Sequence, residues 1–378
     1  MATIIKRAKT FRITVSLGYD GNGKQIRKTT TFKPPEGVTE KKAEKLAQQF
    51  AFEFEQKCHG MTSLNENMRF SDLCTWYFET YAPNTLKGVT VYTYQKQVEK
   101  HLQPVFGNMK LKDFTPAKIT AFFQSIDLSP STCKKLYTIM QSIFARSTEQ
   151  GFLKETPCRN VILPKNNSER KPFLDDSQAK ELLKIVSDYS QLNTIVKVLL
   201  YTGMRSSECL GLQWRDIDFE NHVIRIEHSL ADVGGNHYLQ KPKTKCSKRW
   251  LAMSTVLEDI LKEHKVEQKK KIEYVGEGYA HPEMVFTSEL GNFLDRSSLN
   301  HQFKKIIKNT SFSFASLHSL RHCNATLLIN SGVDLKIVSE HLGHSGVGIT
   351  ADTYADVIAA TKAKVADLIA FDLQENNK

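Results

Sequence analysis

His318-Ser319-Leu320-Arg321, then Leu342-Gly343-His344, then Tyr354 stand in this order near the C-terminus of the chain. Well upstream, Gly203-Met204-Arg205-Ser206-Ser207-Glu208 supplies a second arginine beside a carboxylate. Two arginines can clamp a phosphodiester through paired hydrogen bonds, histidines can donate further ones, and a tyrosine hydroxyl can attack phosphorus without a metal. The pattern predicts a phosphoryl-transfer site with a tyrosine nucleophile, and DNA as its substrate.

The overall charge agrees with a nucleic-acid partner. The 378 residues contain 52 Lys and Arg against 41 Asp and Glu, a net charge of +11. Such an excess attracts polyanions, although it is equally typical of a solvated basic surface. A run of 18 apolar residues, long enough to span a bilayer, does not occur, and Met1 to Lys6 lacks the apolar stretch of a signal peptide. We therefore expect a cytoplasmic, nucleoid-associated protein without a membrane partner.

The cysteines are odd in number, dispersed and without a C-x-x-C pair, which is typical of reduced, buried thiols. They are Cys58, Cys74, Cys133, Cys158, Cys209, Cys246 and Cys323. A zinc site is the alternative, because His318 and His322 have helical i, i+4 spacing with Cys323 beside them. Arg321 would repel a cation there, so the pattern favours phosphate and no metal.

The first of three expected domains, residues 1–60, should combine a small sheet with a helix. Phe11 to Leu17 alternates, Asp20 to Gly23 tolerates positive φ, and Gln25 to Phe32 returns as a Thr-rich strand. A helix should follow from the N-cap Thr39 and cover one sheet face. Basic residues on the other face are candidate DNA contacts, with solvation as the alternative: Arg12, Lys24, Arg27 and Lys28.

The second domain, residues 69–162, should be a four-helix unit. Ser71 and Thr90 can each cap a helix, and Thr115-Pro116 and Ser129-Pro130 each place an N-cap before a proline at the first helical position. The polar helix faces offer sequence-independent phosphate contacts, although surface lysines are commonly only solvated. The candidates are Lys87, Tyr92, Lys96, Lys100, Lys134, Lys135 and Arg146.

The third domain, residues 173–378, should begin after the polar linker from Leu163 to Pro172. Asp175 and Gln178 have the spacing of a capping box, and Gly203 suits the left-handed position that ends a helix. Short strands are expected at His222 to Glu227, His237 to Gln240 and Arg249 to Met253. The fold class is therefore multidomain and mainly α with small β-sheets, and its third domain is mixed α/β but mostly α.

These boxes resemble the tyrosine recombinases. Tyr201 to Glu208, with Leu210 to Asp218, is similar to the first signature box of that family, and His318 to His322 with Leu342 to Tyr354 is similar to the second. The resemblance covers about residues 173 to 370; the helical domain fits the core-binding (SAM-like) domain by pattern alone. The N-terminal domain resembles the arm-type modules of phage and conjugative-transposon integrases.

The resemblance implies a catalytic set of Arg205, Lys243, His318, Arg321, His344 and Tyr354, with Glu208 as an orienting residue. Arg205 and Arg321 would stabilise the phosphorane, and His344 would donate to a nonbridging oxygen. His318 is the nearest base in the sequence for the tyrosine. Lys243 takes the role of acid for the leaving 5′ oxygen, with Lys241 and Lys245 as rivals, because a basic turn gives poor register.

The reaction implied is site-specific cleavage and rejoining of double-stranded DNA through a 3′-phosphotyrosyl intermediate and a Holliday junction, integrating and excising a mobile element. We expect it to need no ATP, metal or other cofactor. Exchange requires four cuts and hence a homotetramer on DNA; in relatives an arm-type module also implies an excisionase or a DNA-bending protein. An amphipathic helix after Tyr354, which in relatives docks on a neighbouring subunit, is indicated by Val357, Ile358, Ala359, Val365, Leu368 and Ile369. Packing on its own domain is the alternative for this helix.

Two other functions remain open at this stage. A type IB topoisomerase would use similar chemistry on a single duplex, although the arm-like domain argues against it. A noncatalytic DNA-binding regulator would bind in a salt-dependent way and form no covalent adduct.

Overall fold

The computed structural model describes residues 3–7, 10–19, 25–35, 37–58, 67–165, 172–241 and 248–358. The chain divides into two compact units, Met1–Ser168 and Glu169–Lys378. The three domains expected from the sequence are a finer division, which stays a prediction. Mainly helical structure with small sheets, the fold class expected from the sequence, is confirmed.

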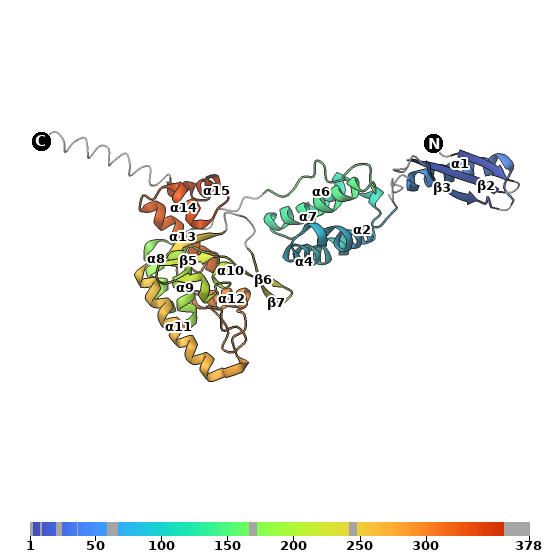
Figure 1. The fold of residues 1–378 in the computed structure, drawn as a ribbon. Coiled ribbons are helices and arrows are strands. Elements are labelled where there is room, and N and C mark those ends of the chain that lie inside the picture. Colours follow the sequence, from blue (N-terminus) through green and yellow to red (C-terminus); the bar gives the residue numbers. More distant parts are fainter. Residues whose placement is uncertain are drawn as a thin grey trace, which may run out of the picture. The chain divides into compact units, whose positions relative to one another are not determined.

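An antiparallel sheet and one helix open the first unit (Figure 1). The strands β1 (Thr3–Arg7), β2 (Thr10–Tyr19) and β3 (Gln25–Phe32) lie in the order β1-β2-β3, and α1 (Glu40–Cys58) packs on one face. The core between sheet and helix contains Phe11, Ala43 and Ala47, with Ile4 and Phe32 packed against it. The hairpin and the helix were expected, whereas β1 was not.

Strand pairing separates the four basic candidates of this sheet. Arg12 pairs with Thr31 and Arg27 with Ser16, so both belong to the face opposite α1. Lys28 pairs with the buried Val15 and therefore belongs to the helix-covered face, although it is exposed at the rim. The expectation that all four share one face is wrong for Lys28, because neighbouring residues of a strand point to opposite faces. Lys24 lies outside the described residues.

The rest of the first unit is helical. Its elements are α2 (Phe70–Trp76), η1 (Tyr77–Tyr81), α3 (Ala82–Thr85), α4 (Gly88–Gln97), η2 (Val98–Leu102), α5 (Gln103–Phe106), η3 (Leu111–Asp113), α6 (Pro116–Ser125) and α7 (Pro130–Glu149). Because α2 to α3 and α4 to α5 are each continuous through a π-helical turn, the longer helical stretches number four, as expected. Phenylalanine rings from several helices meet in its core, for example Phe70 with Phe106, Phe114 and Phe144.

The proline-associated caps are confirmed. The Thr115 hydroxyl accepts from the Lys118 amide at 3.3 Å, and the Ser129 hydroxyl accepts from the Thr132 amide at 3.3 Å. Ser71 and Thr90 are not caps. Their helices begin earlier, after Arg69 and Lys87, without a side-chain hydrogen bond at the N-cap.

The second unit surrounds its core with helices and two small sheets (Figure 1). Its helices are α8 (Asp176–Ile185), η4 (Val186–Asp188), α9 (Ser190–Thr202), α10 (Ser206–Cys209), η5 (Trp214–Asp216), α11 (Thr255–Val275), η7 (Gly276–Gly278), α12 (Arg296–Ile306), α13 (Leu317–Asn330), α14 (Leu335–Leu342) and α15 (Val347–Thr353). The buried α9 packs against α11 and α13, which brings the end of α9 beside Arg321 and Asn324 of α13.

The two sheets of this unit are antiparallel. One has the order β4-β5-β8, from β4 (Ile217–Asp218), β5 (Val223–Ile226) and β8 (Arg249–Ala252). The other is the hairpin of β6 (Ser229–Val233) and β7 (Asn236–Gln240). The sequence predicted β5, β7 and β8 but neither β4 nor β6. In the part of the chain that the structure describes, none of the helices combines the length and apolar character of a membrane span.

Candidate active site

The turn after α9 sets the geometry of the candidate site. Gly203 has φ 62°, the left-handed conformation expected from the sequence, and its amide donates to the Leu199 carbonyl at 3.0 Å. A Cβ at Gly203 would lie 2.5 Å from the Asn324 side-chain oxygen on α13. Glycine therefore permits the close approach of this turn to α13, and the chain leaves it directly into Arg205.

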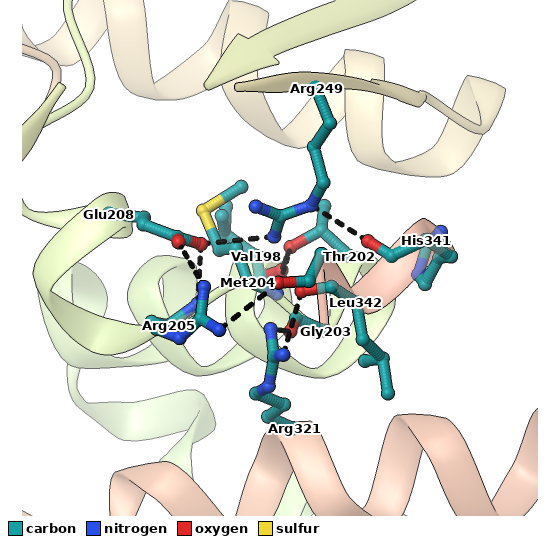
Figure 2. Close-up of polar contacts among 11 residues, drawn as sticks. Val198, Thr202, Gly203, Met204, Arg205, Glu208, Arg249, Arg321, His341 and Leu342 are labelled. Carbon is teal, nitrogen blue, oxygen red and sulfur yellow. Dashed lines mark hydrogen bonds and ion pairs between the residues drawn. The ribbon is translucent and has the colours of Figure 1, made fainter. Parts of the chain in front are cut away.

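Arg205 is fixed by a carboxylate and a carbonyl. Its Nη1 donates to Glu208 Oε1 at 2.7 Å and its Nη2 donates to the Gly343 carbonyl at 3.3 Å (Figure 2). Glu208 also accepts from the Arg205 amide at 3.0 Å and is only 4% exposed. Since half of the guanidinium fork is occupied by Glu208, the orientation of the arginine is set before any ligand arrives.

A third arginine, Arg249 on β8, shares Glu208 (Figure 2). Its Nη2 donates to Glu208 Oε2 at 3.0 Å and its Nε donates to the His341 carbonyl at 2.8 Å. The sequence predicts a strand at this residue but indicates no role for it. A signal was available, because Arg249 has the same strand parity as the buried Leu251, so a charged residue falls on an apolar face.

Arg321 on α13 is buried, with 3% of its surface exposed, and is held by backbone carbonyls. Its Nη1 donates to the Gly203 carbonyl at 2.9 Å and its Nη2 donates to the Leu342 carbonyl at 2.7 Å. Burial lowers its pKa, and the charges of Arg205 and Arg249 lower it further. Three guanidinium groups thus lie near a single carboxylate, Glu208. This excess of positive charge favours a bound anion.

The surroundings of the site disfavour the charged form of its histidines. Burial lowers the pKa of His318, and the charges of Arg321, Arg205 and Arg296 add to the effect. Burial also lowers the pKa of His344 to about 4, with further contributions from Arg321 and Arg205. His344 Nδ1 lies 2.7 Å from the Thr350 hydroxyl, which holds the ring in place.

Tyr354 follows α15 and is fully buried. Its hydroxyl lies 2.9 Å from Nδ1 of His322, and the Phe173 ring packs 5.4 Å from the tyrosine ring. Burial raises the pKa of Tyr354 to about 12, against a smaller lowering by Arg321. The hydroxyl is therefore protonated at neutral pH. The hydroxyl contacts His322, whereas the sequence predicts His318 as the base.

Most of the expected catalytic residues lie within one electrostatic neighbourhood. The charge of Arg321 acts on His318, His344 and Tyr354, and that of Arg205 acts on Arg321 and both of these histidines. Lys243 and its rival Lys245 lie outside the described residues, while Lys241 is exposed at the end of β7. The segment after residue 358, which holds most of the expected C-terminal helix, also lies outside the described residues.

The expected DNA contacts of the helical domain keep mostly exposed positions, and Tyr92, Lys96 and Arg146 have partners within the chain, Tyr92 through the Lys96 ammonium over its ring. Lys96 donates to Glu99 at 2.9 Å, and Arg146 pairs with Glu149 and stacks on the Tyr81 ring. Lys87, Lys100, Lys134 and Lys135 are exposed, and Tyr92 is half-buried. These contacts remain a prediction.

The donor sets offer little for a metal. Cys323 belongs to the hydrophobic core, and burial raises the pKa of its thiol to about 12, which opposes the thiolate needed beside His318 and His322. Among the described residues, Asp232, His237 and Asp295 bring their ligand atoms within 4.8 Å of one another. Both carboxylates already accept backbone amides, from Gly235 and Ser298, so they serve a turn and a helix cap.

Comparison with known proteins gives the same picture for sequence and fold. The profile of the phage integrase family matches residues 172–360, and that of the N-terminal SAM-like domain of phage integrases matches residues 69–126. A tyrosine recombinase XerC-like protein of Caldanaerobacter subterraneus subsp. tengcongensis is 30% identical, covering 97% of each chain. The ICEBs1 integrase of Bacillus subtilis is 26% identical over 94% of this chain and 96% of its own length.

The fold is similar to that of the Tn1549 transposon integrase, solved in complex with a circular intermediate DNA. The TM-score is 0.66 at 21% identity, covering 79% of this chain and 99% of that one.

Proposed function

Since this chain belongs to the phage integrase family of tyrosine recombinases, we propose that it cleaves and rejoins double-stranded DNA at specific sites to integrate and excise a mobile element. The similarity to the ICEBs1 integrase over nearly the full length of both chains supports the assignment to a mobile element. We assign an arm-type DNA-binding role to residues 1–60, core-site binding to 69–162 and catalysis to 173–378.

The observation that carries this proposal is the anchoring of two arginines beside a tyrosine. Arg205 and Arg321 are tied to the carbonyls of Gly343, Gly203 and Leu342, and one carboxylate, Glu208, leaves two positive charges in excess once Arg249 is counted. A pentacoordinate phosphorane carries more negative charge than the phosphodiester it forms from. Preorganised cations therefore stabilise the transition state more than the ground state.

In the proposed reaction the Tyr354 oxygen attacks the scissile phosphorus, the bond to the 5′ oxygen breaks, and a 3′-phosphotyrosine forms. Arg205 and Arg321 hold the nonbridging oxygens, and His318 and His344 donate further hydrogen bonds from their protonated ring nitrogens. Lys243 gives its proton to the leaving 5′ oxygen, with Lys241 and Lys245 as alternatives. Glu208 orients Arg205.

The covalent intermediate conserves the energy of the phosphodiester bond, so a 5′ hydroxyl from another strand can reverse the step. We therefore propose that the enzyme needs no ATP. The charge stabilisation that a metal would supply is assigned to the arginines, so no metal or other cofactor is proposed.

Strand exchange needs two cuts on each of two duplexes, which calls for four active sites and a homotetramer on DNA that passes through a Holliday junction. We assign sequence-independent binding of the DNA duplex to basic residues of the first unit. We also propose that the protein is located at the nucleoid. Accessory partners, an excisionase and a DNA-bending protein, are those that an arm-type module implies.

A nicked suicide duplex tests the proposal. Labelled duplexes from both flanks of the gene, each nicked beside a candidate cut, would be incubated with the full chain and with Tyr354→Phe, then resolved on denaturing gels. We expect a 3′ adduct that maps to Tyr354 and is absent from the variant, which should bind the same DNA with unchanged affinity. Adducts in both proteins would reject Tyr354 as the nucleophile, and tight binding without an adduct in either would favour a noncatalytic regulator.

The DNA product distinguishes a type IB topoisomerase from a recombinase. An enzyme of that class relaxes a supercoiled circle carrying one site, whereas a recombinase joins strands from two sites. Relaxation without recombinant product would therefore overturn the assignment to integration and excision.

A further inference from the structure

The hydroxyl of Tyr354 has a specific neighbour that the catalytic set above does not include. His322 stands one turn after His318 on α13, and its Nδ1 lies 2.9 Å from the tyrosine oxygen. That distance is a normal hydrogen bond, and the tyrosine side chain is wholly enclosed. The nucleophilic atom is therefore held by one identified imidazole.

Packing fixes the plane of that imidazole. Phe173 stacks on the His322 ring at 5.2 Å with an interplanar angle of 27°, and His318 meets it edge-on at 4.8 Å and 85°. Phe173 also packs 5.4 Å from the Tyr354 ring. The phenylalanine thus holds both rings, which keeps Nδ1 directed at the hydroxyl.

The protonation states define the direction of the hydrogen bond. Burial lowers the pKa of His322 to about 4, and the neighbouring His318, Arg321 and His344 lower it further. The pKa of Tyr354 is raised to about 12 by burial. Both groups are neutral near pH 7, so a hydroxyl that donates to an unprotonated Nδ1 is the arrangement that satisfies both, with the ring proton on Nε2.

We propose that His322 is the proton acceptor for the nucleophile, an inference that rests on the proposed function. As the Tyr354 oxygen bonds to phosphorus, its proton passes to Nδ1 of His322, while the 5′ oxygen leaves with a proton from the lysine acid. In religation the 5′ hydroxyl gives its proton to the same lysine as it attacks the phosphotyrosine, and His322 returns its proton to the departing tyrosine oxygen.

The same surroundings restrict this transfer to the DNA-bound enzyme. Without DNA, the positive charge of Arg321 disfavours an imidazolium beside it. A phosphodiester bound between the arginines offsets that charge, so His322 becomes a stronger base when the substrate is in place. An idle tyrosine thus stays protonated and unreactive.

The test is the pH dependence of single-turnover adduct formation by the full chain on the nicked suicide duplexes, from about pH 5.5 to 9.5. His322→Phe keeps a ring against Phe173 but has no acceptor. His322→Asn keeps an acceptor near the position of Nδ1 but cannot take a proton. His318→Phe tests the rival base, and His301→Asn, on the exposed face of α12, is the matched control.

We expect wild type and His301→Asn to share one rate that changes little above pH 7. His322→Phe and His322→Asn should be slower at pH 7 by about 10²- to 10⁴-fold, the usual contribution of a general base. Both should speed up about tenfold per pH unit as solvent removes the phenol proton. DNA affinity and melting temperature, measured on the same proteins, should stay near wild type for His322→Asn.

Each other result decides against the inference. An equal loss at every pH, or full activity of His322→Asn at pH 7, would make His322 a structural residue only. A tenfold-per-unit slope confined to His318→Phe would transfer the role to His318. Absence of any wild-type adduct on DNA that binds would instead reject the proposed function, and this inference with it.

Discussion

At the residue scale, Arg249 adds to the contacts that keep Glu208 oriented toward Arg205. Glu208 Oε1 accepts from the Arg205 side chain, and Oε2 accepts both from the Arg205 amide and from Arg249. Burial raises the pKa of Glu208, and the two arginines with their hydrogen bonds outweigh this, so the net pKa is lowered. Arg249 also ties β8 to the end of α14 through the His341 carbonyl. We therefore regard it as a positioning residue.

Arg249→Lys should weaken catalysis while leaving DNA binding nearly intact. One ammonium group lacks the fork that reaches Glu208 and the His341 carbonyl together, so Glu208 loses an oriented hydrogen bond. We expect adduct formation to fall about tenfold or more and the free energy of unfolding to fall by about 1–3 kcal/mol, the cost of a buried hydrogen bond to a charged group. Suicide-substrate kinetics and chemical denaturation measure the two quantities.

Arg225→Lys is the matched control for this substitution. Arg225 lies on the neighbouring β5 and makes an exposed ion pair with Asp218 at 3.0 Å. Surface pairs of this kind contribute little, so both quantities should stay at wild-type values. Equal losses in the two variants would show that Arg249 has no special role.

A second prediction at this scale concerns acid stability. The pKa of His344 is lowered to about 4 in the folded chain, whereas it is about 6.5 in an unfolded one. Between these values the unfolded state binds more protons, so the contribution of His344 to stability is complete above about pH 6.5 and is lost as the pH falls toward 4. The sign is that of a base whose folded pKa is depressed.

His344→Asn isolates this contribution, since asparagine can keep a polar contact with Thr350 but does not titrate. The difference in unfolding free energy between wild type and variant should shift in favour of the variant as the pH is lowered from 7 to 4. Denaturation curves across that range measure it. If the unfolding free energies of wild type and variant depend on pH in the same way, the pKa of His344 is not lowered in the folded chain.

At the scale of elements, the turn from α9 into α10 joins the two arginines of the site. Gly203 accepts from Arg321 through its carbonyl, and Arg205 follows two residues later. Its positive φ and its contact with α13 both require glycine. The conformation of this loop therefore determines where the two guanidinium groups lie.

Gly203→Ala should disturb both arginines. The added Cβ would lie 2.5 Å from Asn324 Oδ1 and 3.1 Å from Leu342 Cδ2, and the left-handed φ adds about 1–2 kcal/mol of strain. Gly332→Ala is the matched control, because Gly332 has φ 79° but open space around its Cβ position. We expect a larger loss of stability for Gly203→Ala by thermal melting, and loss of adduct formation for it alone. Equal effects would assign everything to φ and nothing to the contact.

Sequence patterns predicted these elements where a local signal exists. Thr115, Ser129 and Asp175 cap their helices, and Asp175 forms the expected capping box with Gln178. Ser71 and Thr90 were wrong: the helix of Ser71 begins one residue earlier, at the buried Phe70, and that of Thr90 begins at Gly88. Strands β1, β4 and β6 were missed, because each gains its stability from a partner strand rather than from its own residues.

The π-helical turns were also missed, although a cause is visible in the sequence. Each comes directly before a proline-containing segment, at Pro83 and Pro104. Proline lacks an amide hydrogen and its ring crowds the preceding turn, so the helix accommodates it with a locally wider turn. The pattern of apolar residues alone gives no sign of this.

The candidate site was predictable in its residue types but not in its contacts. Arg205, Arg321 and Tyr354 were indicated by order and spacing, and the structure places them in one neighbourhood. Which of His318 and His322 meets the tyrosine depends on the packing of Phe173 from the segment before α8, and spacing along the sequence cannot predict that contact. Arg249 likewise depends on a tertiary contact with Glu208.

At the scale of the whole molecule, the net charge of +11 favours DNA binding whose affinity falls steeply as the salt concentration rises. Each basic residue that contacts a phosphate releases its own counterions. The contributions of separate parts of the chain to the logarithm of the DNA affinity should therefore add. The sheet within residues 3–32 allows DNA binding to be tested separately from cleavage. Strand pairing shows which of its basic residues belong to the face opposite α1 and which to the face that α1 covers.

Arg12→Ala and Arg27→Ala, made together in the full chain, should weaken binding to DNA that carries the arm-type sites. Both residues are exposed and belong to the sheet face opposite α1, and Lys28→Ala on the other face is the matched control. If both arginines contact phosphates, the slope of log affinity against log salt should decrease by about 2, roughly one for each contact. Adduct formation on a short duplex holding only the cleavage site should stay unchanged, because the proposed catalytic residues belong to the second unit. An equal loss with Lys28→Ala would mean that the sheet face does not select the contact, and a loss of cleavage on the short duplex would mean that this sheet acts in catalysis rather than in binding.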